Sequence, residues 1–206
     1  MSVSDVIASE DSQEKRMEEA LGHSFTVPVE AESDDAAIVE AARTDPQAFG
    51  ELYERFYPRV YRYVYLRVGN IPDAEDVTGL VFIKALEALR TYQSRGNGFA
   101  PWIFRIARNA VVDHYRRQRK QTSLENIDFE GGEGDPIISV LGNDNRTELR
   151  ALVETLSADQ REVILLRYAA ELSFCEIATI LKKKEPAIRM LLHRGLRKLK
   201  AVIDEA

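Results

Sequence analysis

The sequence has very few of the residues that build cross-linked or metal-bound proteins. Its 206 residues include one cysteine, Cys175, and three scattered histidines, His23, His114 and His193. A single cysteine cannot form an internal disulfide, and these four residues show no metal-ligand spacing. The sequence therefore argues against a disulfide scaffold and a structural zinc site. We expect Cys175 to be a half-buried helical residue and not a redox switch.

Long apolar runs are also missing. No stretch approaches the roughly 18 apolar residues that a membrane-spanning helix needs. The N-terminal residues carry acids where a secretory signal would carry bases followed by an apolar run. From these absences we expect an intracellular, cytoplasmic protein with no membrane insertion. Hydrophobic residues make up 45% and charged residues 30% of the chain, which is typical of a folded globular protein.

The charges are sorted along the chain, although the net charge is only -6. Residues 1–33 hold 8 acids and 2 bases, and residues 34–120 hold 11 acids and 14 bases. Residues 121–145 hold 6 acids and no bases, and residues 146–206 hold 9 acids and 12 bases. This pattern predicts two basic folded domains, 34–120 and 146–206. It also predicts a flexible, acidic, glycine-rich linker at 121–145. Residues 1–33 are expected to form an acidic, disordered N-terminal extension, with a regulatory or docking segment as the alternative.

The sequence pattern of residues 34–120 predicts helices throughout. Asp45 before Pro46 is typical of a helix start, and apolar residues then recur at helical spacing as far as Val64. A second start follows at Asn70, and a third helix opens near Pro101. We therefore expect an all-α fold.

The helix that follows Pro101 has a basic stripe opposite its apolar face. Between Arg105 and Lys120 there are six bases and one acid, Asp113. Arginines of this kind bind phosphates, and the nearby aromatics Phe99 and Trp102 could stack on unpaired bases. A solvated arginine-rich face with Trp102 in the core explains the same pattern equally well.

Residues 146–206 carry a more specific pattern. Ser157 and Ser173 each begin a capping box, with Gln160 and Glu176 three residues later. The second box opens a short helix that ends at Lys182-Lys183-Lys184, and Pro186 opens a longer basic helix. A short helix, a tight turn and a longer basic helix form a helix-turn-helix, which places its second helix in the DNA major groove.

Signatures of catalysis are missing from the sequence. It has no catalytic triad, paired acid site or phosphate-binding glycine loop, so we predict that the protein is not an enzyme, uses no cofactor and has no small-molecule substrate. Two functions remain besides the one developed below. One is a helix-turn-helix regulator that binds duplex DNA unaided, and the other is an interaction module that sequesters a partner.

Five motifs in order give the sequence a family resemblance. They are Asp45-Pro46-Gln47-Ala48-Phe49, Asp73-Ala74-Glu75-Asp76, Trp102-Ile103-Phe104-Arg105-Ile106-Ala107-Arg108-Asn109, Leu172-Ser173-Phe174 with Glu176-Ile177-Ala178, and Leu192-His193-Arg194. In these motifs the chain resembles the sigma-70 superfamily, and its two-domain layout resembles the extracytoplasmic-function (ECF, group 4) RNA polymerase sigma factors. Such proteins keep only regions 2 and 4.

The resemblance implies a promoter-specificity factor that binds core RNA polymerase, recognises the −10 and −35 elements and promotes DNA melting. The residues implied for −10 recognition and melting are Asn97, Phe99, Trp102, Arg105, Arg108, Asn109, Arg116 and Arg117. Those implied for the −35 element are Lys184, Arg189, Met190, His193, Arg194 and Arg197. Those implied for core polymerase are Asp73, Asp76, Leu80 and Lys84.

The implied partners are promoter DNA and the β′ clamp helices and β flap of core polymerase, with an anti-sigma factor as a further candidate. The chain departs from the family pattern at several positions. Gly79 and Leu80 stand where the clamp-binding helix has Gln-Glu, and Met190 and Leu191 stand where the −35 helix has Ser-Arg. The turn also has Lys182 in place of glycine.

Overall fold

The computed structural model of the chain describes residues 31–93, 98–122 and 155–204, and these residues contain no β-strand. The elements are α2 (Ala31–Ala42), α3 (Pro46–Val68), α4 (Ile71–Leu89), α5 (Ala100–Thr122), α7 (Ala158–Ile164), η2 (Leu165–Ala169), α8 (Phe174–Leu181) and α9 (Glu185–Asp204). The predicted all-α class is confirmed. The N-terminal residues 1–30 and most of the predicted linker lie outside the described residues.

Short polar residues set the beginnings of the helices, as the sequence predicts. The Asp45 carboxylate accepts a hydrogen bond from the Gln47 backbone N–H at 2.8 Å, and Asn70 caps α4 through the Asp73 N–H at 2.9 Å. Ser157 and Ser173 form the two predicted capping boxes at the starts of α7 and α8. Each cap satisfies backbone donors that a helix leaves unpaired in its first turn.

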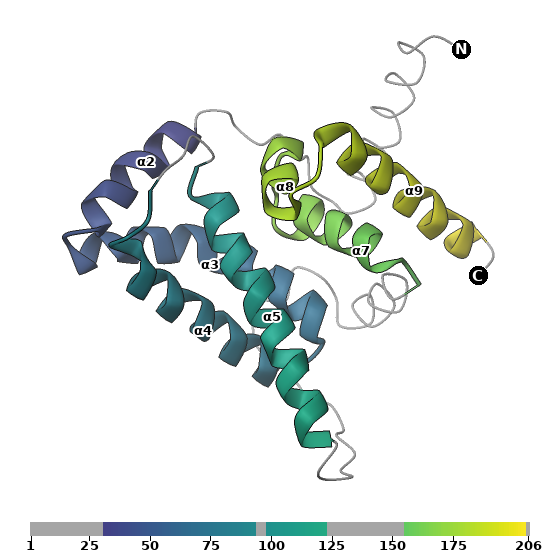
Figure 1. Ribbon diagram of the computed structural model, residues 1–206, viewed down its shortest axis with the longest axis horizontal. Helices are drawn as coiled ribbons and strands as arrows, with labels where there is room; N and C mark the ends of the chain where they lie inside the picture. The colour runs from purple at the N-terminus through teal and green to yellow at the C-terminus, as the bar shows by residue number, and fades with distance from the viewer. Residues whose placement is uncertain (1–30, 94–97, 123–154, 205–206) are drawn as a thin grey trace.

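Helices α2 to α5 form the N-terminal helical domain, in which α3 packs against the other three (Figure 1). Its core includes the fully buried side chains of Phe56, Tyr63 and Phe104. The rings of Phe56 and Phe99 meet edge to face with centroids 5.0 Å apart, and those of Tyr63 and Phe104 do so at 5.8 Å. Interlocking aromatics of this kind fix the relative positions of α3 and α5.

Elements α7, η2, α8 and α9 form the C-terminal helical domain. Helix α9 packs along α7, where Gly195 lets the two helices approach closely: a Cβ added there would lie 2.8 Å from Ile164 Cδ1. Between α8 and α9 the chain turns at Lys182, whose φ of 54° is left-handed. The predicted helix-turn-helix is therefore present, and a lysine occupies the turn conformation that glycine adopts most easily.

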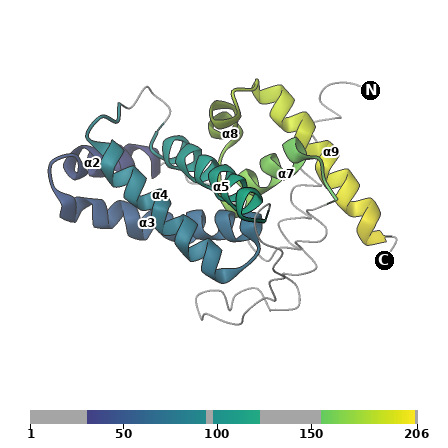
Figure 2. The same ribbon diagram turned by 60° about the horizontal axis from the view of Figure 1, so that its bottom comes forward.

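The two domains lie side by side, with α5 against α8 and α3 against η2 (Figures 1 and 2). The sequence does not predict this contact. It arises between residues about a hundred positions apart, which helical periodicity cannot relate.

The structure adds two local features that the sequence did not indicate and corrects one expectation. Helix α2 begins at Ala31, slightly before residue 34, where the charge pattern predicts the start of the domain. The π-helical segment η2, in which hydrogen bonds join residues five apart, has no signal that the sequence analysis used. Cys175, expected to be half-buried, is exposed.

Candidate nucleic-acid interface

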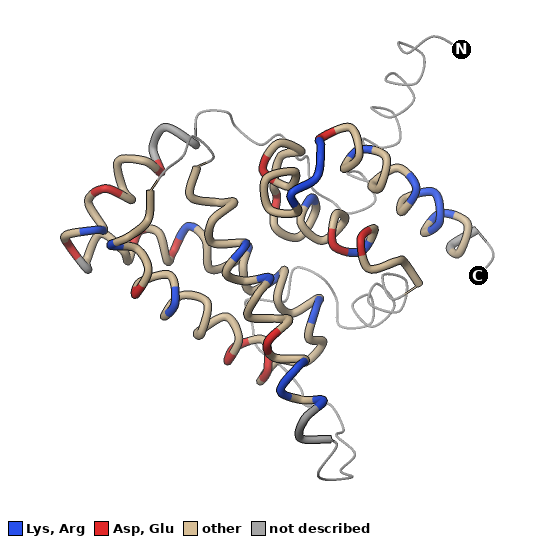
Figure 3. The backbone as a smooth tube through the Cα atoms, in the orientation of Figure 1, with Lys and Arg blue, Asp and Glu red and all other residues tan. Residues whose placement is uncertain are grey.

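Helix α5 presents a basic face opposite the side on which most of its apolar residues are buried. Ile103, Phe104 and Ala107 are fully buried, whereas Arg105 and Asn109 are exposed. Arg116 and Arg117 are exposed further along the helix, and Figure 3 shows basic residues gathered toward this end. The structure thus places most of the predicted −10 residues on one accessible helix, while Arg108 is only half-exposed.

The aromatic residues before α5 do not form the open stacking surface that the sequence suggested. Phe99 is only 2% exposed and packs against Phe56, Tyr92 and Trp102, so it belongs to the core. Its ring is thus covered in this arrangement, and its expected role in holding an unpaired base stays a prediction. Trp102 is half-buried, with its ring 4.8 Å from that of Tyr92. Asn97 lies outside the described residues.

The helix-turn-helix exposes its predicted DNA-reading face. Met190 is 52% exposed, Lys184, Arg189, Arg194 and Arg197 are exposed, and His193 is half-buried. The side chain of Arg189 is held in place: its guanidinium carbon lies 4.0 Å from the ring centroid of Phe174, and it donates to Glu185 at 2.8 Å. A cation over an aromatic face is attracted by the ring quadrupole, so Phe174 orients Arg189 at the start of α9.

The predicted polymerase-binding residues on α4 have different surroundings. Asp73 faces α5, where it accepts hydrogen bonds from Asn70 at 2.7 Å and Gln118 at 3.2 Å and lies 3.4 Å from His114. Asp76 and Lys84 are exposed, and Leu80 is half-buried. Two apolar residues of this helix are exposed, Ile83 (55%) and Leu86 (45%), although helical spacing places Leu86 at the edge of the apolar stripe.

The sequence matches two family models, one over the N-terminal helical domain and one over the C-terminal helical domain. Residues 52–121 match Sigma-70 region 2, and residues 146–199 match Sigma-70, region 4. The chain is 36% identical over 182 residues to the ECF RNA polymerase sigma factor BldN of Streptomyces coelicolor. That alignment covers 85% of this chain and 69% of the relative. The chain belongs to the ECF RNA polymerase sigma factors.

Further relatives agree with this assignment. The ECF sigma factor SigD of Mycobacterium tuberculosis is 31% identical over 188 residues, which is 88% of this chain and 89% of the relative. Among solved structures, CnrH in complex with the cytosolic domain of CnrY has a TM-score of 0.65 at 24% identity. The match covers 83% of this sigma factor and 97% of CnrH. RpoE from Bartonella quintana, in complex with the anti-sigma factor NepR, has a TM-score of 0.63 at 20% identity, covering 76% and 96% of the two chains. These two likenesses show a shared fold.

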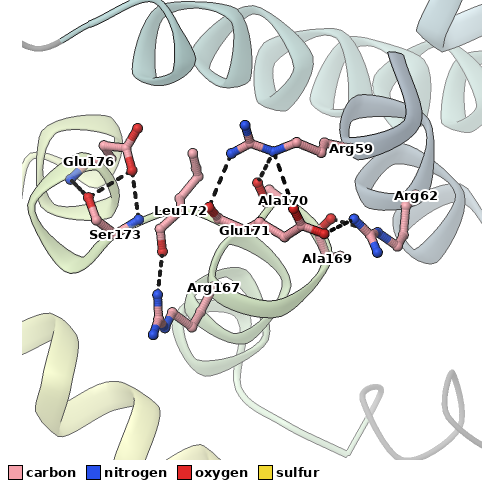
Figure 4. Close-up of polar contacts among 9 residues, drawn as sticks. All are labelled: Arg59, Arg62, Arg167, Ala169, Ala170, Glu171, Leu172, Ser173 and Glu176. Carbon is pink, nitrogen blue, oxygen red and sulfur yellow. Dashed lines mark hydrogen bonds and ion pairs between the residues drawn. The ribbon is translucent and has the colours of Figure 1, made fainter. Parts of the chain in front are cut away.

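In this sigma factor a polar network joins the two domains (Figure 4). Arg59 Nε donates to the Ala170 carbonyl at 2.8 Å, and Arg62 Nε donates to the Ala169 carbonyl at 2.8 Å. Arg62 also pairs with the Glu171 carboxylate. Burial lowers the pKa of the Arg59 guanidinium, although the Glu171 charge opposes that shift.

The deepest part of this network is the Glu162 carboxylate on α7, which is 7% exposed. It accepts a hydrogen bond from Tyr63 at 2.7 Å, pairs with Arg67 and lies 3.5 Å from Arg108 Nε. Burial, followed by the Glu162 charge, raises the pKa of Tyr63 well above its ordinary value. The sequence analysis missed Glu162. The sequence feature that could have indicated it is an acidic residue directly beside the apolar residues Val163 and Ile164, on a helix face expected to be buried.

The described residues offer neither a metal site nor a membrane-spanning helix. Within 31–93, 98–122 and 155–204, no group of three or more His, Cys, Asp or Glu side chains is arranged to hold a metal ion. Within the same ranges, no helix combines the length and apolarity needed to cross a lipid bilayer.

Proposed function

We propose that this ECF sigma factor directs core RNA polymerase to promoters by reading the −10 element with its N-terminal domain and the −35 element with its C-terminal domain. The observation that carries the proposal is the match of the chain to region 2 and then region 4. Each matched segment contains a helix with an exposed basic face, on α5 and α9. The protein contributes binding and DNA melting, and no chemistry of its own.

At the −10 element, the exposed residues of α5 supply the contacts. Arg105, Arg108, Arg116 and Arg117 bind backbone phosphates, while Asn97, Trp102 and Asn109 contact bases near the site of melting. Because each neutralised phosphate releases counterions, this surface makes promoter opening salt-dependent.

At the −35 element, α9 enters the major groove with its N-terminal end. Arg189, Met190, His193 and Arg194 face the base edges, and Lys184 and Arg197 bind flanking phosphates. Support comes from the exposure of this face and from the orientation of Arg189 by Phe174.

Core polymerase binds along the outer face of α4. Asp76, Leu80 and Lys84 are accessible for this contact, and exposed Ile83 and Leu86 extend it with apolar area. Asp73 contributes by holding α4 to α5. The β′ clamp helices fit this surface, and the β flap contacts the C-terminal domain. An anti-sigma factor is a further proposed partner, by analogy with the relatives solved in complexes with such proteins or with a cytosolic partner domain.

Run-off transcription tests the proposal. The purified chain added to core polymerase should give promoter-dependent RNA, whereas the chain alone should show little sequence-specific DNA affinity. Arg189→Ala should reduce transcription only from promoters that depend on a −35 element. Equal loss on templates that lack this element would contradict the assignment of α9. Tight, specific duplex binding without polymerase would instead support the alternative, a helix-turn-helix regulator. Membership of the sigma factor family does not favour that alternative.

The basic face of α5 has its own test. Arg105→Ala combined with Arg108→Ala should weaken open-complex formation and flatten its salt dependence by about 0.9 for each lost phosphate contact. An unchanged dependence of log K on log salt would remove these arginines from the DNA contact.

A further inference from the structure

The contact between the domains brings four arginines of the N-terminal domain against oxygen atoms of the C-terminal domain. Arg59, Arg62 and Arg67 come from α3, and Arg108 comes from α5. The acceptors are the carbonyls of residues 169–171 and the carboxylates of Glu162 and Glu171. Across the boundary these guanidinium groups thus contact oxygen acceptors that are either partly or fully negative.

Such a set of partners resembles the environment that a nucleic-acid backbone offers. A guanidinium group binds carboxylate and phosphate oxygens through the same planar fork of donors. Burial lowers the pKa of Arg59, which shows that its guanidinium is partly removed from water, and oxygen acceptors offset the cost of that desolvation. The C-terminal domain supplies these acceptors while the two domains are packed against each other, which we call the closed arrangement.

The closed arrangement does not allow the proposed function, on which this inference rests. The −35 and −10 elements lie about 25 base pairs apart, or roughly 85 Å at about 3.4 Å per base pair. Helix α5 contacts α8, and α8 contacts α9, so the two DNA-reading helices lie only about 20 Å apart at about 10 Å between the axes of packed helices. Two domains packed directly on one another cannot reach both elements, so the domains must separate on a promoter.

Separation leaves Arg59, Arg62, Arg67 and Arg108 without their acceptors. Their guanidinium groups are then exposed to solvent and free to bind other oxygen acceptors, phosphates among them. Only Arg108 is among the predicted DNA contacts, and it lies beside the accessible face of α5 described above. Its neighbours on α3 therefore extend the basic surface of α5 once the C-terminal domain has moved.

We propose that Arg59, Arg62, Arg67 and Arg108 form a binding surface for the phosphate backbone of promoter DNA, which the oxygens of the C-terminal domain occupy in the closed chain. DNA and the C-terminal domain then compete for the same guanidinium groups. The surface is independent of sequence, because it reads phosphates and not base edges.

The first experiment breaks the contact from the acceptor side. In the full-length chain, Glu162→Gln should separate the domains and raise affinity for a short single-stranded deoxyoligonucleotide about tenfold, without polymerase. Separation is read by energy transfer between a dye on exposed Cys175 and a second dye on Thr91→Cys. Asp159→Asn is the matched control. It makes the same charge change in the C-terminal domain, where Asp159 pairs with Lys183 at 2.9 Å, and should alter neither reading.

The second experiment adds Arg67→Ala to Glu162→Gln. If Arg67 binds phosphate in the opened chain, the double variant binds DNA more weakly than Glu162→Gln alone. The slope of log K against log salt should also decrease by about 0.7, the value for one contact to a single strand. If Arg67 only holds the domains together, affinity stays equal or rises and the slope is unchanged, which overturns the proposal.

A second pair of variants covers the case in which Glu162→Gln does not fold. Glu171→Gln, with and without Arg62→Ala, repeats the comparison at an ion pair whose side chains are about one-third exposed. A tenfold gain with Asp159→Asn would attribute the effect to net charge and also overturn the proposal. If the unmodified chain gives promoter-dependent RNA but the slope of log K against log salt is unchanged in both double variants, the proposed phosphate-binding surface is refuted and the sigma role stands. If that slope decreases in the double variants but the unmodified chain gives no promoter-dependent RNA, the sigma role is refuted and the surface stands.

Discussion

A single carboxylate does most to join the two domains at the residue scale. Glu162 is 7% exposed and is surrounded by Tyr63, Arg67 and Arg108, all from the N-terminal domain. A carboxylate at this depth is tolerated only while donors satisfy it. Removing one donor therefore costs more than the hydrogen bond itself contributes.

Tyr63→Phe tests this dependence together with its pH response. At neutral pH the variant should lose about 1–2 kcal/mol of unfolding free energy, because Glu162 loses a buried donor. The raised pKa of Tyr63 predicts a second effect. The unfolded chain releases this proton near pH ~10 while the folded chain retains it, so stability is present below that pH and is lost as the pH rises above it.

Urea unfolding between about pH 8 and 11 measures that loss. Tyr63→Phe should show a shallower decrease in stability than the unmodified chain. The matched control is Tyr53→Phe, because the Tyr53 side chain is 41% exposed, and it should retain the original decrease. Identical pH profiles for all three proteins would mean that Tyr63 does not couple folding to proton release.

At the scale of single elements, two helices contain glycines in opposite surroundings. Gly79 is exposed within α4, and an added Cβ would have no neighbour within 4 Å. Gly195 is buried within α9, where an added Cβ would lie 2.8 Å from Ile164 Cδ1 and 3.4 Å from Gln160 Cβ. Helical propensity favours alanine at both positions, but packing opposes it at the second.

Gly79→Ala should therefore raise the unfolding free energy by about 1 kcal/mol. Gly195→Ala should give a smaller gain or a loss, because Ile164 must move aside. Chemical denaturation of the two variants side by side measures the difference. Equal gains would show that α7 and α9 are less tightly packed than the structure indicates.

The turn of the helix-turn-helix offers a third change. Lys182 has a φ of 54°, a conformation that costs a residue with a Cβ about 1 kcal/mol. Lys182→Gly should raise the thermal stability of the C-terminal domain by up to about that amount. Lys182→Ala removes the same side chain and keeps the Cβ, so it should leave the stability nearly unchanged. A greater gain from alanine would contradict the assigned conformation.

The elements also show what could be predicted from the sequence. Helix starts at Asp45, Asn70, Ser157 and Ser173 were predicted because a cap and its partner lie within three residues of each other. The basic faces of α5 and α9 follow in the same way from helical spacing. The burial of Phe99 could not be predicted, because an aromatic residue in a loop carries no local sign of whether it faces the core or the solvent.

At the scale of the whole molecule, the interface between domains was not predictable from periodicity, because Arg62 and Glu171 are 109 positions apart. Such contacts depend on the shapes of two finished domains. The family resemblance indicated the function of the chain. The residues that hold its two domains together could be identified only from the folded structure.

Assembly with polymerase gives the prediction at this scale. Ile83→Ser on α4 should weaken binding to core polymerase about tenfold, because a 55% exposed isoleucine adds little to folding but can bury apolar area in a complex. Met190→Ser is the matched control: its side chain is 52% exposed on α9, and core binding should not change. Thermal melting checks that both variants fold. Undiminished core affinity in Ile83→Ser would place the polymerase contact elsewhere.

The use of main-chain acceptors at residues 169–171 has a consequence for mutational scanning. Arg59 and Arg62 bond to carbonyl oxygens there, and every amino acid carries such an oxygen. Side-chain replacement at Ala169 or Ala170 therefore leaves these acceptors in place. Because Ala169 is 4% and Ala170 0% exposed, a saturation library would report sensitivity to larger side chains there and attribute it to packing, so the part that the carbonyl oxygens play in the contact would go undetected.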